Sequence, residues 1–115
     1  MAEKNGIAVV GTALVDRINE ISAYPNSGEL TKISSVSRAV GGCVPNVAID
    51  IKRFDPTINV KAVCKVGNDS DGEFLAETLT ENGVDTGCFS KGEVTTSFTD
   101  VMSIKGGQRT FFTYP

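Results

Sequence analysis

Asp16 stands where an α/β protein is expected to carry a ligand-binding carboxylate. It follows soon after an apolar run at residues 7–14, IAVVGTAL, which does not alternate and is therefore typical of a strand buried on both faces. Open α/β sheets bind their ligands just beyond the carboxyl ends of such strands. An ionised carboxylate accepts hydrogen bonds, so Asp16 would suit a ligand that carries several hydroxyl groups.

A glycine pair and an asparagine provide a second set of polar groups, in the segment AVGGCVPNVA at residues 39–48. Gly41 and Gly42 leave room for a ligand close to the backbone. Their N–H groups would lie at the start of a helix, where partial positive charge favours an oxygen atom. Asn46, one turn into that helix, offers both a donor and an acceptor. The residues alone leave another interpretation open, a tight strand-to-helix turn with Asn46 as a local cap.

A third segment, KVGNDSDGEF at residues 65–74, is interpreted as structural. Ser70 and Glu73 have the spacing of a capping box and predict the start of a second helix. Asp69 is expected to cap that helix rather than to bind a ligand. Other polar residues are expected to have no role in binding: ordinary strand residues at Thr96 and Ser97, and a solvated hairpin charge at Arg109.

Cysteine and histidine content limits the chemistry that this chain could perform. The sequence has three separated cysteines, Cys43, Cys64 and Cys88, with no CxxC pair and no histidine. We therefore predict no zinc or other metal site, and three buried or half-buried thiols. Without histidine, the usual Ser–His and Cys–His nucleophiles are also excluded. Cys43 is accordingly interpreted as a small residue lining a site rather than as a nucleophile.

Composition and charge exclude several classes of partner. The chain has 115 residues, enough for one core, and a net charge of −3 without a run of basic residues. A nucleic-acid partner would require a basic stripe, so none is expected. No segment approaches the roughly 20 apolar residues of a membrane helix, and the short apolar run near the N-terminus does not resemble a signal peptide. We expect a cytoplasmic protein without a membrane partner.

Periodicity and turn signals predict the elements that would position these residues. Two polar extended pieces, at 17–22 and 30–40, would form a small antiparallel sheet apart from the main one. A first helix, with Pro45 in its first turn, would bury one apolar face. Its members are Val44, Val47, Ala48, Ile51 and Phe54. A strand at 58–66, a helix ending at Asn82-Gly83, a short strand at 84–89 and a hairpin of 97–104 with 109–114 complete an α/β fold.

The order and spacing of the motifs resemble the ribokinase-like sugar kinases, also called the phosphofructokinase-B family. GTALVD at 11–16, GGCVPNVA at 41–48 and VGNDSDGEF at 66–74 match this family in sequence order. The family signature of two glycines followed by Asn and a small residue corresponds to Gly41, Gly42, Asn46 and Ala48. The resemblance covers nearly all of this chain, but only about the first third of a family member.

The resemblance implies a fold and a set of binding residues. The chain would be the N-terminal part of a three-layer α/β/α domain, with core segments 1–15 and 41–115 and a small β lid at about 16–40. The sugar would be held by Asp16, by the Gly41-Gly42 backbone and by Asn46. Leu14 and Cys43 would line the same site, at positions where ribokinase has an asparagine and a lysine. These two departures argue against ribose as the substrate, and the GGxxxNVA form of residues 41–48 is more similar to fructokinase-like or ketodeoxygluconate-kinase-like members.

The resemblance also implies cofactors and partners. Family members use ATP with Mg²⁺, and their phosphate-binding and catalytic segment, Gly-Ala-Gly-Asp, comes late in the sequence. No such segment occurs in this chain, so it is expected to have no catalytic residue, to bind no ATP by itself and to be inactive alone. The expected partners are a sugar and a second copy of the chain, which would pair through the lid.

Three other interpretations remain at this stage. The GxxLxD form of residues 11–16 also resembles nucleoside kinases. A non-catalytic sugar-binding or dimerisation module would use only the lid and the pocket of Asp16 and Asn46. An unrelated nucleotide-binding α/β domain is disfavoured, because GTALVD does not match the GxGxxG fingerprint.

Overall fold

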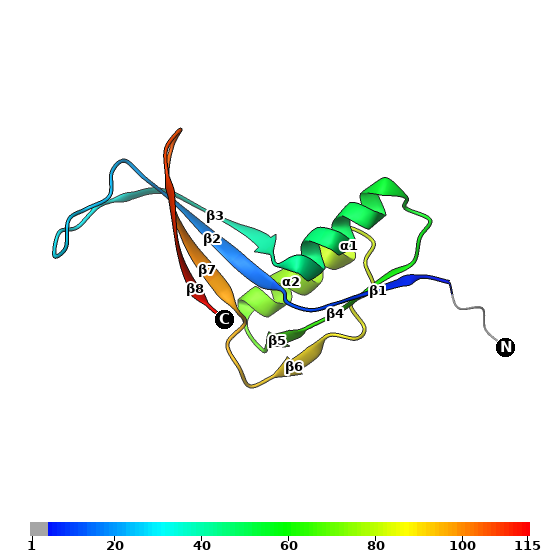
Figure 1. Ribbon diagram of the computed structural model, residues 1–115. Coiled ribbons are helices and arrows are strands. Elements are labelled where there is room, and N and C mark those ends of the chain that lie inside the picture. The colour runs from blue at the N-terminus through cyan, green and yellow to red at the C-terminus, as the bar shows by residue number, and fades with distance from the viewer. Residues whose placement is uncertain (1–4) are drawn as a thin grey trace. The chain divides into compact units, whose positions relative to one another are not determined.

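A computed structural model describes residues 5–115, which fall into two compact units. Unit 1 contains the residues up to Leu14 together with Val40–Thr96, and unit 2 contains Val15–Ala39 and Ser97–Pro115. The chain therefore passes between the units three times. Figure 1 labels the elements in chain order. The fold is of the α/β class, as the sequence predicted.

Unit 1 is built from short parallel strand pairs and two helices. Strand β1 (Ile7–Val10) pairs in parallel with β4 (Val60–Val63), and β5 (Lys65–Gly67) pairs in parallel with β6 (Ser90–Gly92). Helix α1 (Cys43–Phe54) packs against β1, β4 and helix α2 (Ser70–Glu81) (Figure 1). The strand predicted at 58–66 is present in this position, but it is interrupted at Cys64.

The buried face of α1 differs from the predicted one. The structure buries Val44, Pro45, Ala48 and Ile49, whereas Val47 is 45% exposed and Phe54 is 88% exposed. The buried face consists of two neighbouring rows with four-residue spacing, Val44 with Ala48 and Pro45 with Ile49. It is buried because α1 packs against β1 and β4. Hydrophobic spacing alone did not distinguish it from the stripe through Val47. In α2, the predicted residues Leu75 and Leu79 are fully buried.

Strand β1 is not buried on both faces as predicted. Ile7 is 43% exposed and Val10 is 70% exposed. The physical reason is that β4 is its single strand neighbour among residues 5–115, while α1 packs against it. An apolar sequence favours burial, but a strand is buried on both faces only when other elements cover both faces.

Unit 2 is organised around a four-stranded sheet. Its strand order is β3 (Ile33–Gly41), β2 (Leu14–Ile21), β7 (Phe98–Ile104) and β8 (Arg109–Tyr114). β2 and β7 are parallel, in a register that places Asp16 opposite Thr99, and β7 and β8 form the predicted antiparallel hairpin.

The division of the chain differs from the one expected from the sequence. Residues 97–115 were grouped with the core segments, and the strands at about 16–40 were expected to form a sheet of their own. In the structure the hairpin β7–β8 joins β2 and β3 in unit 2. This pairing joins residues more than 80 positions apart, from Val15 with Phe98 to Ile21 with Ile104, so no local pattern reveals it.

Residues 84–89, predicted as a strand, pair with β4 only at Asp85 and then form a turn. The Gly87 N–H donates to the Asp85 carboxylate at 2.8 Å, and the Phe89 N–H donates to the Thr86 carbonyl at 3.1 Å. Asp85 makes a single parallel bridge with Lys61, and the strand β6 begins only at Ser90. The local hydrogen bonds of Asp85 therefore take precedence over the apolar pattern.

Candidate functional site

The start of α1 packs tightly against the chain that follows β1. Gly42 is the N-cap residue, with φ 89° and ψ 169°, a conformation that side chains disfavour. A Cβ atom there would lie 2.8 Å from the Thr12 carbonyl oxygen. The Val44 N–H donates to the same oxygen at 3.0 Å. Because Thr12 follows the carboxyl end of β1, the first turn of α1 lies at the strand end where the sequence predicted a ligand.

Cys43 is exposed at the first position of α1. Its Sγ lies 3.5 Å from Thr12 Oγ1 and 3.8 Å from the Thr12 carbonyl oxygen. The hydrogen bond from the Thr12 side chain lowers the pKa of the Cys43 thiol below its usual value. A Cβ atom on Gly11 would come within 2.8 Å of this sulfur, so the small residue at Gly11 makes room for it.

The prediction of three buried or half-buried thiols was wrong for two of the cysteines. Cys43 and Cys88 are exposed, and only Cys64 is buried. Burial raises the pKa of the Cys64 thiol to about 11. Cys64 lies between β4 and β5 in the interior of unit 1, whereas Cys43 begins a helix and Cys88 lies in a turn.

Asn46 is exposed on the first turn of α1. Its backbone N–H donates to the Gly42 carbonyl at 3.4 Å. The helix has no side-chain capping hydrogen bond, so Asn46 does not act as the local cap that the alternative interpretation required. The amide therefore stays exposed at the same end of α1 as Gly42 and Cys43.

The other predicted binding residues belong partly to each unit. Gly41 is buried and Leu14 is half-buried, both in unit 1. Asp16 is half-buried on β2 of unit 2, and burial raises the pKa of its carboxyl group above the usual value. The structure thus groups Gly41, Gly42, Cys43 and Asn46 at the start of α1, and it describes Asp16 within the sheet of unit 2.

Sequence reasoning missed Thr12. Its carbonyl and hydroxyl groups both reach the first turn of α1, through Val44 and Cys43. A polar residue between Gly11 and the start of β2, in a segment otherwise made of small and apolar residues, was the signal available in the sequence.

The third segment has the structural role that was expected, and Asp69 caps α2 as predicted. Asp69 is the N-cap of α2, and its side chain accepts a hydrogen bond from the Gly72 N–H at 2.8 Å. Ser70 is the first helical residue, so the predicted capping box with Glu73 is wrong in detail. Asp69 takes this position because its carboxylate reaches both the helix and Thr96.

Thr96 is buried and lies before β7 rather than within a strand, which corrects the expectation for it. Ser97, also expected in a strand, immediately precedes β7. Arg109 is exposed at the first position of β8, in agreement with a solvated charge.

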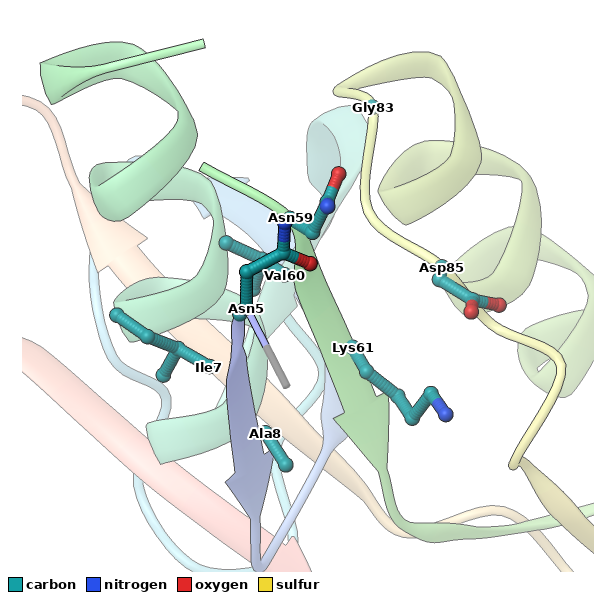
Figure 2. Close-up of a pocket in the computed structure, with 9 residues that line it drawn as sticks. Asn5, Ile7, Ala8, Asn59, Val60, Lys61, Gly83 and Asp85 are labelled. Atoms are coloured by element: carbon teal, nitrogen blue, oxygen red, sulfur yellow. The ribbon is translucent and has the colours of Figure 1, made fainter. Parts of the chain in front are cut away.

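An open hollow of about 710 Å³ lies at the amino ends of β1 and β4, whereas the start of α1 lies at the carboxyl end of β1. Figure 2 shows Ile7 and Ala8 of β1, Lys61 of β4 and the nearby Asp85 around it. It is lined by Asn5, Gly6, Ile7, Ala8, Asn59, Val60, Lys61, Gly83 and Asp85. None of the predicted binding residues contributes to this hollow.

Within residues 5–115, no three side chains of His, Cys, Asp or Glu are grouped so that they could hold a metal ion. Among the same residues, neither helix has the length and apolar character needed to cross a bilayer.

We expect Cys43 to be the most reactive thiol of the folded protein. Iodoacetamide should alkylate Cys43 faster than the exposed Cys88 at pH 7, because hydrogen bonding by Thr12 favours the thiolate, which is the nucleophile. Buried Cys64 should not react until the protein unfolds. Peptide mass spectrometry over a pH series measures the three rates.

The matched variant is Thr12→Val, which removes the hydroxyl and keeps the shape. It should shift the midpoint of the Cys43 rate profile to higher pH and leave Cys88 unchanged. Equal rates at Cys43 and Cys88, or an unshifted midpoint in the variant, would contradict this account of the thiol.

Comparisons with known proteins agree with the motifs. The family model of the pfkB family carbohydrate kinases matches residues 4–115. A Pyrococcus horikoshii protein, provisionally named a sugar kinase, is 31% identical over 108 residues, which are 94% of this chain and 33% of that protein.

Solved structures share the fold. The ribokinase of Arabidopsis thaliana, solved with ribose and ATP, has a TM-score of 0.83 at 24% identity, over 97% of this chain and 36% of its own. The nucleoside kinase of Methanocaldococcus jannaschii has a TM-score of 0.82 at 20% identity, over 99% of this chain and 38% of its own. This chain thus spans about a third of the relatives that it matches, and it has the fold of their N-terminal part. With its motifs, its fold and this match over nearly its whole length, the chain belongs to the pfkB family of carbohydrate kinases.

Proposed function

We propose that this chain carries the substrate-binding part of a kinase that transfers phosphate from ATP to a hydroxyl group of a sugar. The observation that supports this most is the start of α1, where a glycine N-cap, an exposed thiol and an exposed amide lie at the carboxyl end of β1. Open α/β sheets bind ligands at this end. The same residues match the family signature.

Each predicted residue has a distinct role in this proposal. The backbone at Gly41 and Gly42 lets sugar oxygens approach the start of the helix. The Asn46 amide donates to one hydroxyl and accepts from another. Cys43 and Leu14 shape the site around the sugar. Asp16 accepts hydrogen bonds from sugar hydroxyl groups, which requires the ionised carboxylate.

Unit 2 is proposed to act as the lid and as the dimer contact. Closure of a lid excludes water, which would otherwise compete for the transferred phosphate. Unit 2 exposes several large apolar side chains, an arrangement that favours contact with another protein surface. They are Leu30, Ile33, Val36, Phe111, Phe112 and Tyr114. We propose that a second copy of the chain covers part of them.

ATP and Mg²⁺ are assigned to the remainder of the parent protein. The described residues offer no group of three metal-binding side chains, and the sequence has neither a Walker-type GxxxxGK[ST] motif nor a Gly-Ala-Gly-Asp segment. On this proposal, the nucleotide and its metal are bound by residues outside 1–115. The three free thiols agree with a reducing compartment, so we propose a cytoplasmic location.

A nucleoside is the second candidate substrate. The structural similarity to the nucleoside kinase of Methanocaldococcus jannaschii favours it, together with the GxxLxD form of residues 11–16. A nucleoside carries a ribose with free hydroxyl groups, so the same polar residues could hold it.

A binding module without catalysis predicts sugar binding and dimerisation that do not depend on ATP.

Two measurements on this chain test the proposal. Fructose, ribose, 2-keto-3-deoxygluconate, adenosine and uridine are titrated against ¹⁵N-labelled protein, and NMR shifts of the Gly42, Cys43 and Asn46 amides report binding. We expect shifts at these amides for one chemical class of ligand, and none at Lys61 or Asp85 in the distant hollow. Shifts confined to the hollow, or none with any ligand, would overturn the proposed site.

A coupled assay of ADP release tests the division of labour. We expect no turnover above background from this chain with ATP, Mg²⁺ and any of the five compounds, because the catalytic base and nucleotide site are assigned elsewhere. Measurable turnover would show that residues 1–115 contain the catalytic machinery, and that assignment would be wrong.

A further inference from the structure

A buried cluster connects the start of α2 to the last residues of unit 1. Thr96 is only 1% exposed. Its hydroxyl donates to Asp69 Oδ1 at 2.6 Å and accepts from the Gly67 N–H at 2.8 Å. Its backbone N–H donates to Asp69 Oδ2 at 2.8 Å. Asp69 therefore uses both carboxylate oxygens on Thr96, while Oδ1 also caps α2 through Gly72.

These hydrogen bonds go beyond what a helix cap needs. An N-cap residue satisfies one or two free N–H groups of its own helix, and a serine or asparagine does so as well as an aspartate. At Asp69, two hydrogen bonds of the carboxylate join it to Thr96, 27 residues away. A carboxylate forms stronger hydrogen bonds than a neutral group, so this second connection is a substantial one.

Glycine packing keeps the three segments of the cluster in close contact. A Cβ atom on Gly67 would lie 1.9 Å from the Val94 carbonyl oxygen, and one on Gly72 would lie 2.3 Å from the Gly67 carbonyl oxygen. The end of β5, the first turn of α2 and residues 94–96 thus touch through their backbones. Such a contact holds residues 94–96 in one place within unit 1.

Residues 94–96 are the last residues of unit 1 before the chain enters unit 2. Thr96 is the last residue of unit 1 and Ser97 is the first of unit 2. The other two passages between the units, at 14/15 and 39/40, lie inside the strands β2 and β3. The passage at 96/97 lies outside any strand. On its unit 2 side the Ser97 carbonyl accepts a hydrogen bond from the Val15 N–H at 3.1 Å, and on its unit 1 side the cluster around Asp69 holds Thr96.

We propose that Asp69 and Thr96 are positioning residues, which together clamp the unit 1 end of the passage at 96/97. Movement of unit 2 would then be taken up beyond Thr96, a consequence that rests on the proposed lid function, whereas the clamp itself does not. The GNDSDG segment at residues 67–72 thereby anchors the chain that leads into β7.

Hydrogen exchange in the protein without ligand tests the clamp. Thr96→Val removes the hydroxyl but keeps the side-chain shape and leaves the Asp69 cap on Gly72 in place. We expect exchange at the Gly67 amide and at residues 94–98 to rise at least about tenfold, because local opening exposes them without global unfolding. Amides of α1 and β4 should stay within about twofold of wild type.

Two further variants separate the clamp from general stability. Thr96→Ser retains the hydroxyl and should keep the wild-type exchange pattern. Asp69→Ser retains a capping oxygen but cannot reach Thr96 with two atoms, so it should reproduce the local rise, and it serves if Thr96→Val does not fold. Unchanged exchange at Gly67 and 94–98, or an equal rise throughout α1 and β4, would overturn the clamp.

The outcome is independent of ligand binding. A local rise in exchange with no binding of any sugar or nucleoside would support the clamp and contradict the proposed function. Ligand binding at α1 without a local rise in exchange would support the proposed function and contradict the clamp.

Discussion

Gly67→Ala is expected to destabilise the protein more than any other glycine-to-alanine change in unit 1. The new methyl group would lie 1.9 Å from the Val94 carbonyl oxygen, and that oxygen belongs to backbone held by the neighbouring Thr96. Overpacking of this kind costs about 3 kcal/mol or more. Thermal unfolding should therefore show a fall in Tm of more than about 10 °C for a domain of this size.

Gly92→Ala is the matched control. Gly92 is the cross-strand partner of Gly67 in the β5–β6 ladder. A Cβ atom there would meet only the flexible end of Lys65, with Cε at 3.4 Å. Its Tm should stay within about 3 °C of wild type, because alanine also restricts the unfolded chain. A Gly67→Ala protein as stable as Gly92→Ala would show that the backbone at Val94 yields easily.

Asp16→Asn is expected to have the largest effect on ligand binding. If the carboxylate accepts hydrogen bonds from sugar hydroxyl groups, the amide replaces one acceptor oxygen by a donor and loses the charge. Hydrogen bonds to a charged group are worth about 1.5–3 kcal/mol, so affinity should fall about 10- to 100-fold. Titration of the ligand found by NMR measures this loss. Asp85→Asn, in the distant hollow, is the control and should bind normally.

The pH dependence of binding should follow the ionisation of Asp16. Burial raises the pKa of this carboxyl group in the folded protein, so the charged form is lost at a higher pH than for an ordinary aspartate. Affinity should fall as the pH drops through the raised pKa, and it should be independent of pH in this range for Asp16→Asn. Binding by wild type that stays constant down to the usual pKa of aspartate would contradict the role of the carboxylate.

The same shift predicts an effect on stability with the opposite sign. A carboxyl group whose pKa is raised on folding favours the folded state below its unfolded pKa, and this contribution is lost as the pH rises through the folded pKa. At neutral pH the half-buried charge therefore costs stability. Asp16→Asn should unfold at a slightly higher temperature than wild type at pH 7, and this advantage should disappear in acid. Such a residue, which lowers the stability of the fold but improves binding, is expected at a functional site.

The sequence by itself determined the class of the fold, both helices and the family. Pro45 after a glycine pair, and Asp69 ahead of Gly72, are local signals that act within one helical turn, and the structure confirms a helix start at each. The hairpin of β7 and β8 was predicted for the same reason, because Gly106-Gly107 and the alternation on either side lie within a few residues. The proposed site at Gly41, Gly42 and Asn46 also came from the sequence, and its role in binding stays a prediction.

The tertiary structure decided whatever depends on residues far apart in the chain. Burial of Pro45 and Ile49 rather than Val47 on α1 depends on where β1 and β4 lie. Exposure of Cys43 was likewise not predicted. The pairing of β2 with β7 and the bonds from Asp69 to Thr96 join segments that share no local pattern. Such contacts form because folding pairs buried polar groups and packs side chains between segments far apart in the sequence. The local spacing of residues does not show which distant segments will meet.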